Sequence, residues 1–126
     1  INISGLSGFD DAGYRFNLHR MEHTLETYGF AAYNNGKAVF AYTADTLWCS
    51  AVEEIISTGA DAVLLDLNGE PDDPIPVHMS ENDLLAKGLP LLRGGTTLYG
   101  THLKKNKTSS TERIKYPLPG TVIIAG

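Results

Sequence analysis

The apolar residues of this chain fall into short runs that turn-forming residues separate. Residues 30–33 and 38–42 flank the turn that contains Asn35 and Gly36, and Asn-Gly between two apolar runs is a strong signal for a β-hairpin. Residues 62–67 (AVLLDL) form a continuous apolar run of the length of a buried strand. Residues 121–125 (TVIIA) predict a closing strand.

Three other segments have helical spacing. Residues 46–58 present a wide apolar stripe, with Asp45 as the predicted cap and Gly59 as the predicted stop. Residues 80–87 predict a shorter helix, in which Ser80 is the cap and Asp83 its capping-box partner. Leu18, Met21, Leu25 and Tyr28 follow one face of a helix over about residues 17–28.

Two further hairpins complete the predicted order of elements. Residues 89–92 and 96–99 flank Gly94 and Gly95, and a third, longer hairpin has the polar residues 104–111 at its tip. This mixture predicts an α+β fold, with a mainly antiparallel sheet built from β-hairpins that packs against two or three short helices. We expect one domain over residues 1–126, with a flexible, glycine-rich N-terminal arm at about residues 1–13.

Cysteine content and hydropathy exclude several classes of protein. The single cysteine, Cys49, allows neither an intrachain disulfide nor a cysteine-based zinc cluster. No apolar run is long enough for a membrane span, and no charged-then-apolar leader indicates a visible signal peptide. We therefore expect a cytoplasmic or virion location and no membrane contact.

The charges divide unevenly along the chain. Residues 1–103 are strongly acidic, whereas the basic residues of the C-terminal part outnumber its acids, and the whole chain has a net charge of −5. The predicted partner-binding residues are Lys104, Lys105, Lys107, Arg113 and Lys115. Such a patch suits an acidic partner, and the sequence favours a neighbouring copy or another protein, because a nucleic acid would be repelled by the acidic remainder.

One short stretch carries candidate chemistry, the H-x-x-E-H pattern from His19 to His23. It resembles the motif of inverted-zincin metallopeptidases, and this resemblance implies zinc bound by His19 and His23, with Glu22 as the general base. On the predicted helix, however, these three residues lie opposite the apolar stripe and point to solvent.

A catalytic zinc ion also needs a third protein ligand. Spacing does not choose among the candidates, which are Glu26, Glu70, Asp72, His78, His102 and Glu112.

The leading functional hypothesis is therefore a non-enzymatic structural or interaction module without a cofactor. Such a module would assemble with itself or within a larger complex, as virion- and particle-associated proteins do. The sequence leaves two alternatives open. One is a small zinc-dependent hydrolase that uses the H-x-x-E-H helix, and the other is an anion or nucleic-acid binder that uses residues 104–115.

Overall fold

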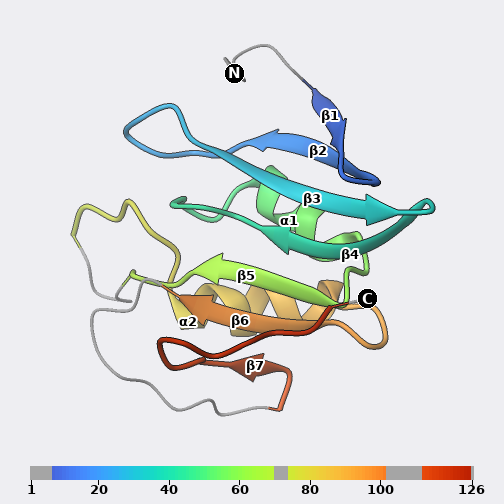
Figure 1. Ribbon diagram of the computed structural model, residues 1–126. Coiled ribbons are helices and arrows are strands. Elements are labelled where there is room, and N and C mark those ends of the chain that lie inside the picture. Colours follow the sequence, from blue (N-terminus) through green and yellow to red (C-terminus); the bar gives the residue numbers. More distant parts are fainter. Residues whose placement is uncertain (1–6, 70–73, 102–111, 126) are drawn as a thin grey trace.

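Seven strands form one sheet whose spatial order equals their order in the chain (Figure 1). The computed structural model describes residues 7–69, 74–101 and 112–125. The strands are β1 (Gly8–Asp11), β2 (Tyr14–Arg20), β3 (Tyr28–Asn34), β4 (Lys37–Tyr42), β5 (Ala62–Asp66), β6 (Thr97–Thr101) and β7 (Ile114–Lys115). Strands β1 to β4 pair antiparallel, and β4 to β7 pair parallel. The sheet is therefore mixed, and the prediction of a mainly antiparallel sheet built from hairpins is wrong.

The parallel pairs β4–β5 and β5–β6 arise because helical segments carry the chain from one strand to the next. Helix α1 (Ser50–Ser57) connects β4 to β5. Helix α2 (Glu81–Asp83) continues into a π-helical turn (Leu84–Gly88) and a 3₁₀ turn (Leu89–Leu91) between β5 and β6. Both helices lie behind the sheet in the view of Figure 1, so they cover one face of it.

The two C-terminal hairpins that the sequence predicted are absent from the described residues. Leu89–Leu91 is a 3₁₀ turn rather than a strand, so Thr97–Thr101 pairs with β5 instead of with the residues just before it. In the same way β7 pairs parallel with β6. Residues 104–111, the predicted tip of the third hairpin, lie outside the described residues, and residues 121–125 form no strand.

The predicted helix over residues 17–28 is also wrong. This segment contains the second half of β2, a loop and the start of β3, and Leu18 pairs with Phe30 across the two strands. Phe16 and Leu18 alternate with polar residues, as expected for a strand, and the backbone of residues 15–20 pairs with that of residues 28–33 in β3. Of the predicted N-terminal arm, residues 8–11 form β1.

Other local predictions are confirmed. Asn35 and Gly36 adopt φ values of +51° and +77°, which a primed hairpin turn requires. Ser80 forms the predicted capping box with Asp83. Helix α1 begins later than predicted, with Cys49 rather than Asp45 at its N-cap.

The hydrophobic core lies between the helices and the sheet face that they cover. Helix α1 buries Ala51, Val52, Ile55 and Ile56 in it. The sheet contributes fully buried side chains from five strands, which are Ala31, Ala41, Val63, Leu65, Leu98 and Ile114. No helix within the described residues has the length and apolar character needed to cross a membrane.

Candidate metal centre

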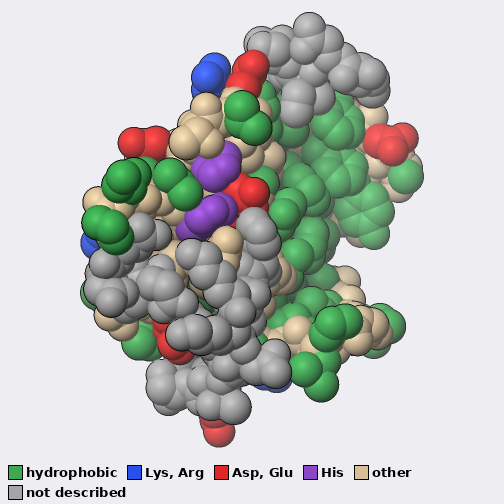
Figure 2. Space-filling view, turned by 90° about the vertical axis from the view of Figure 1, so that its left-hand side faces the viewer, with side chains coloured by type: hydrophobic (Ala, Val, Ile, Leu, Met, Phe, Trp, Pro, Cys, Tyr) green, Lys and Arg blue, Asp and Glu red, His purple; other side chains and the backbone are tan. Residues whose placement is uncertain are grey.

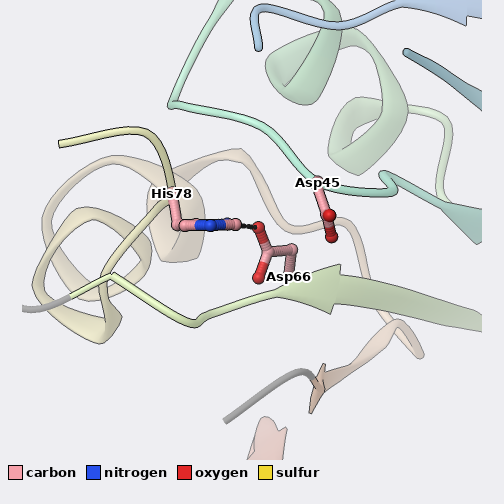
Figure 3. A group of neighbouring side chains, drawn as sticks. All are labelled: Asp45, Asp66 and His78. Atoms are coloured by element: carbon pink, nitrogen blue, oxygen red, sulfur yellow. Dashed lines mark hydrogen bonds and ion pairs between the residues drawn. The ribbon is translucent and has the colours of Figure 1, made fainter. Parts of the chain in front are cut away.

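The carboxyl ends of the parallel strands β4, β5 and β6 meet at one edge of the sheet, on the left in Figure 1. Figure 2 looks at this edge, where histidine and acidic side chains lie close together. Three residues gather there: Asp45 follows β4, Asp66 ends β5, and His78 precedes α2 (Figure 3). Each offers one ligand atom, and these atoms all lie within 4.8 Å of one another.

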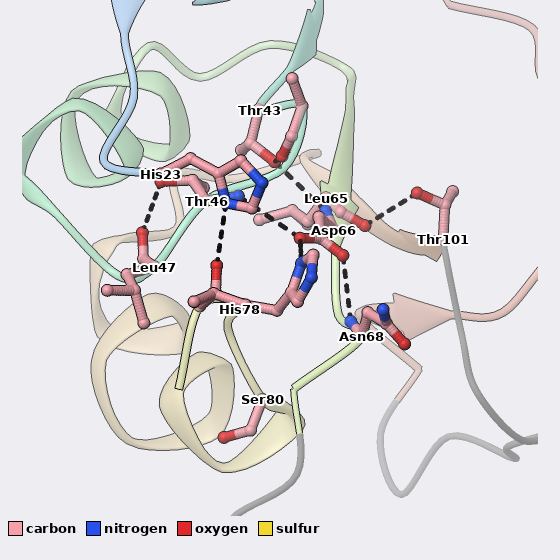
Figure 4. A network of polar contacts seen from close by, with 12 residues as sticks. His23, Thr43, Thr46, Leu47, Leu65, Asp66, Asn68, His78, Ser80 and Thr101 are labelled. Atoms are coloured by element: carbon pink, nitrogen blue, oxygen red, sulfur yellow. Dashed lines mark hydrogen bonds and ion pairs between the residues drawn. The ribbon is translucent and has the colours of Figure 1, made fainter. Parts of the chain in front are cut away.

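Asp66 is the buried centre of this group, with 1% of its surface exposed. Its carboxylate accepts hydrogen bonds from the backbone amides of Thr46 (3.3 Å) and Asn68 (3.0 Å), and from Nδ1 of His78 (2.5 Å; Figure 4). Because an ionised carboxylate only accepts, this contact places the His78 proton on Nδ1. This contact holds the imidazole ring of His78 against the carboxylate of Asp66.

The chain between β4 and α1 positions Asp45. Thr43 is fully buried, and its hydroxyl accepts a hydrogen bond from the amide of Asp66 at 3.2 Å. Ala44 adopts φ +58°, a left-handed conformation that turns the chain directly before Asp45. Thr46, also fully buried, ties the other side of the turn to Asp66. The carboxylates of Asp45 and Asp66 are thus placed by one hydrogen-bonded unit.

The segment that carries His78 is held against the end of β5. The amide of Met79 donates to the carbonyl of Thr46 at 2.9 Å, and the amide of Gly69 donates to the carbonyl of Met79 at 2.8 Å. A Cβ atom on Gly69 would lie 2.4 Å from the carbonyl oxygen of His78, so only glycine permits this close approach. This packing brings a residue that lies 12 positions after Asp66 back to its carboxylate.

The structure separates the members of the H-x-x-E-H pattern, because they lie on a strand end and a loop instead of a helix. His19 is at the end of β2 and contacts Glu54 of α1, with 3.2 Å between Nδ1 and Oε2. His23 donates from Nδ1 to the carbonyl of Val77 at 3.2 Å, and its ring centroid is 5.3 Å from that of His78. His23 therefore lies beside the candidate metal centre, whereas His19 is engaged by α1.

Glu22 contributes to this region through its backbone. Its amide donates to the hydroxyl of Thr46 at 3.1 Å, and its carbonyl accepts from the amide of Leu47 at 2.9 Å. The side chain of Glu22 is exposed.

The other sequence candidates lie elsewhere or outside the described residues. Glu26 accepts a hydrogen bond from the hydroxyl of Tyr28, and Glu112 is exposed. Among the predicted partner-binding residues, Arg113 donates to the carbonyls of Thr96 and Arg93, and Lys115 is exposed on β7. The candidates outside the described residues are Glu70, Asp72, His102, Lys104, Lys105 and Lys107.

The negative charge of the group also acts on a neighbouring tyrosine. Burial raises the pKa of Tyr42, and the carboxylates of Asp45 and Asp66 raise it further. Tyr42 therefore stays neutral at the edge of the site.

Sequence reasoning included His78 among six candidates but did not single out Asp45 and Asp66 as site residues. A signal was present, since each of the two acids follows an apolar run of strand length. In a parallel sheet, acids at two such positions lie at the same edge. Because the sequence analysis predicted a mainly antiparallel sheet, it did not place Asp45 and Asp66 at the same edge.

Comparison with solved structures shows that the fold of this chain is the metallo-β-lactamase fold. The chain is similar to the metallo-β-lactamase fold protein YhfI from Bacillus subtilis, with a TM-score of 0.59 and 21% identity, over 76% of this chain and 39% of that one. It is similar to an isothiocyanate hydrolase from Delia radicum gut bacteria, with a TM-score of 0.68 and 16% identity, over 91% of this chain and 56% of that one.

A possible metal-dependent hydrolase from Veillonella parvula gives a TM-score of 0.71 at 11% identity, over 92% of this chain and 56% of that one. The chain thus spans about half the length of the structures that it matches. The sequence matches no protein-family model and no curated protein.

These likenesses correct the leading functional hypothesis. The proteins that share the fold are described as hydrolases or as metallo-β-lactamase fold proteins. The expectation of a non-enzymatic structural or virion-associated module is therefore wrong, and the hydrolase alternative agrees better with the fold and the metal-type residue group. That alternative placed its motif on a helix which does not form.

Proposed function

We propose that this chain carries a divalent metal site of a hydrolase, formed by Asp45, Asp66 and His78. The observation that carries the proposal is the convergence of two carboxylates and one imidazole within 4.8 Å at the carboxyl ends of the strands. Carboxylate oxygen and imidazole nitrogen are ligands that suit zinc and similar ions, so the residues present fit such a metal. A bound ion would supply a Lewis acid and lower the pKa of a water molecule bound to it.

The residues around the ion would perform the remaining tasks. The hydrogen bond between His78 and Asp66 holds these two candidate ligands together at the site. Asp45, on a separate loop, brings a second negative charge that offsets the charge of the cation. Two structurally similar proteins support hydrolase activity. One is the isothiocyanate hydrolase from Delia radicum gut bacteria, and the other is the possible metal-dependent hydrolase from Veillonella parvula.

Metal content tests the proposal directly. We expect the purified protein to hold stoichiometric zinc or manganese by elemental analysis after dialysis, and the Asp45→Ala and His78→Ala variants to lose most of it. His19→Ala is the matched control, because His19 contacts Glu54 instead of this group and its removal should leave the metal in place. A wild-type protein that binds no divalent ion in the presence of excess zinc would contradict the proposal.

Activity gives a second, separate readout. In the complete polypeptide that contains this chain, we expect hydrolysis of a panel of chromogenic esters and phosphodiesters to be lost with a chelator and with Asp45→Ala. A His78→Ala variant that keeps its metal but loses activity would show that His78 transfers protons instead of binding the ion.

A further inference from the structure

A pocket of about 510 Å³ lies at the end of the sheet opposite the candidate metal centre. Two hairpin turns form its rim, one between β1 and β2 and the other between β3 and β4, and both lie at the right-hand end in Figure 1. Small-molecule sites have volumes of about 300–1,000 Å³. We use the name turn pocket for this pocket and for five of the polar residues that line it, which are Asp10, Arg15, Asn17, Tyr33 and Asn35.

The register of the first three strands brings side chains of the turn pocket together. Arg15 of β2 lies opposite Asp10 of β1 on one side and opposite Tyr33 of β3 on the other. Residues directly opposite each other point to the same face of a sheet, and Asn17 shares this face because it follows Arg15 by two positions. Arg15 has two contacts there: its Nη1 is 3.6 Å from Oδ2 of Asp10, and its Nε donates to Oδ1 of Asn17 at 3.2 Å.

Both turns at the rim have a defined backbone conformation. Ala12 and Gly13 adopt φ values of +50° and +84°, and Asn35 and Gly36 adopt φ values of +51° and +77°. Two successive positive φ values are typical of the type I′ turn, whose twist matches that of the flanking strands. The rim of the turn pocket is therefore formed before a ligand binds, which lowers the cost of ordering it on binding.

The charges of the turn pocket favour an uncharged ligand. Asp10 and Arg15 carry opposite charges and pair with each other, and the amides of Asn17 and Asn35 carry no charge. An ion in the pocket would be attracted by one member of the pair and repelled by the other, so the two effects offset each other.

The same groups present both donors and acceptors of hydrogen bonds. An ionised carboxylate only accepts, a guanidinium only donates, and an amide does both. Because a hydroxyl group donates and accepts, a compound with several hydroxyl groups can pair with all three kinds of group at once. The ring of Tyr33 packs against the core and offers an apolar surface to the carbon-bound hydrogens of such a compound.

We propose that the turn pocket binds an uncharged polyhydroxy compound, namely a neutral sugar unit. The guanidinium of Arg15 presents paired donors that suit two neighbouring hydroxyl oxygens, and the carboxylate of Asp10 accepts from a further hydroxyl. The sugar unit belongs either to a free sugar or to the end of a saccharide chain, and both have this chemistry. The turn pocket is remote from the candidate metal centre, so this proposal stands or falls separately from the proposed function.

Titration of the isotope-labelled complete polypeptide with sugars, followed by NMR spectroscopy, tests the proposal. Glucose and N-acetylglucosamine are the free-sugar probes, and cellotriose and chitotriose are the corresponding chains. We expect at least one neutral sugar to shift the amide signals of the turn pocket in a saturable way. Tighter binding of the trimer than of its monomer would assign the site to saccharide chains, and equal binding would assign it to free sugars. Glucuronate and glucosamine are the charged counterparts, and we expect both to bind more weakly than glucose.

Two variants and a matched control locate the binding. Arg15→Ala should weaken sugar binding about tenfold or more, since hydrogen bonds to charged groups are among the stronger ones. Tyr33→Leu keeps an apolar side chain against the core but removes the ring, so it should also weaken binding. Arg20→Ala should bind sugars as the wild type does. Arg20 is on the same strand and has a similar exposed contact, with 3.7 Å between its Nη1 and Oε1 of Glu26.

The amide signals of α1 and β5 show in the same spectra that each variant is folded. The proposal would be overturned if no neutral sugar shifted the signals of the turn pocket, or if glucuronate or glucosamine bound more tightly than glucose. Equal sugar binding by Arg15→Ala and Arg20→Ala would also overturn it.

Discussion

Replacement of Asp66 by alanine should cost more stability than any surface substitution in this chain. The carboxylate is 1% exposed and accepts hydrogen bonds from Thr46, Asn68 and His78. A buried donor that loses its acceptor costs about 1–3 kcal/mol, and Asp66→Ala removes the acceptor of three donors. We therefore expect Asp66→Ala to lower the free energy of unfolding by about 3–5 kcal/mol, a large share of the ~5–15 kcal/mol that domains have.

Equilibrium unfolding in urea at pH 7, followed by circular dichroism, measures this loss. Asp66→Asn keeps the shape but replaces one acceptor oxygen with a donor, so we expect a loss of about 1–3 kcal/mol. Asp61→Ala is the matched control, because Asp61 pairs with the exposed Lys37 at 3.5 Å and a surface pair contributes only about 0–1 kcal/mol.

The ring of His78 gives the second readout. In the wild-type protein, the Nδ1 proton is held by Asp66, so it should exchange slowly enough for a separate proton signal in NMR spectra. In Asp66→Ala, we expect this signal to disappear. If Asp66→Ala unfolded with the same free energy as Asp61→Ala and kept the imidazole signal, the reasoning about the buried carboxylate would be refuted.

Three further substitutions test single contacts. Gly69→Ala should lose about 1–3 kcal/mol in urea unfolding, because its Cβ would overlap the backbone beside His78, whereas Gly94→Ala, with open space around it, should keep wild-type stability. Gly36→Ala should cost about 1–2 kcal/mol in the same assay, since its φ is +77°; an unchanged midpoint would contradict the assigned turn. Burial first, and Glu81 second, raises the pKa of Tyr116 above its ordinary value of 10.0. The folded state thus keeps a proton that the unfolded state releases, so stability should fall as the pH rises past 10, and Tyr116→Phe should show a smaller fall in pH-jump unfolding.

The elements that sequence reasoning predicted correctly depend on residues close together in the chain. Asn35 and Gly36 tolerate positive φ, so their turn follows from two residues alone. Ser80 and Asp83 form a capping box within one turn of helix. The apolar stripe of α1 and the apolar run of β5 were equally readable, because each has its own length and period.

Strand direction and the members of the site depend on residues far apart in the chain. Whether residues 97–101 pair with the preceding segment or with β5 depends on how the helical crossover packs on the core, and local spacing does not contain that information. His19 and His23 are four positions apart, yet an extended backbone and a loop take one to α1 and the other to His78.

The sequence by itself determined the turns, the caps and the apolar periods, since these follow from single residues and their nearest neighbours. Only the tertiary structure decided that Asp45, Asp66 and His78 form one group. The physical reason is that parallel pairing brings the ends of successive strands to one edge, across 33 positions of sequence between Asp45 and His78.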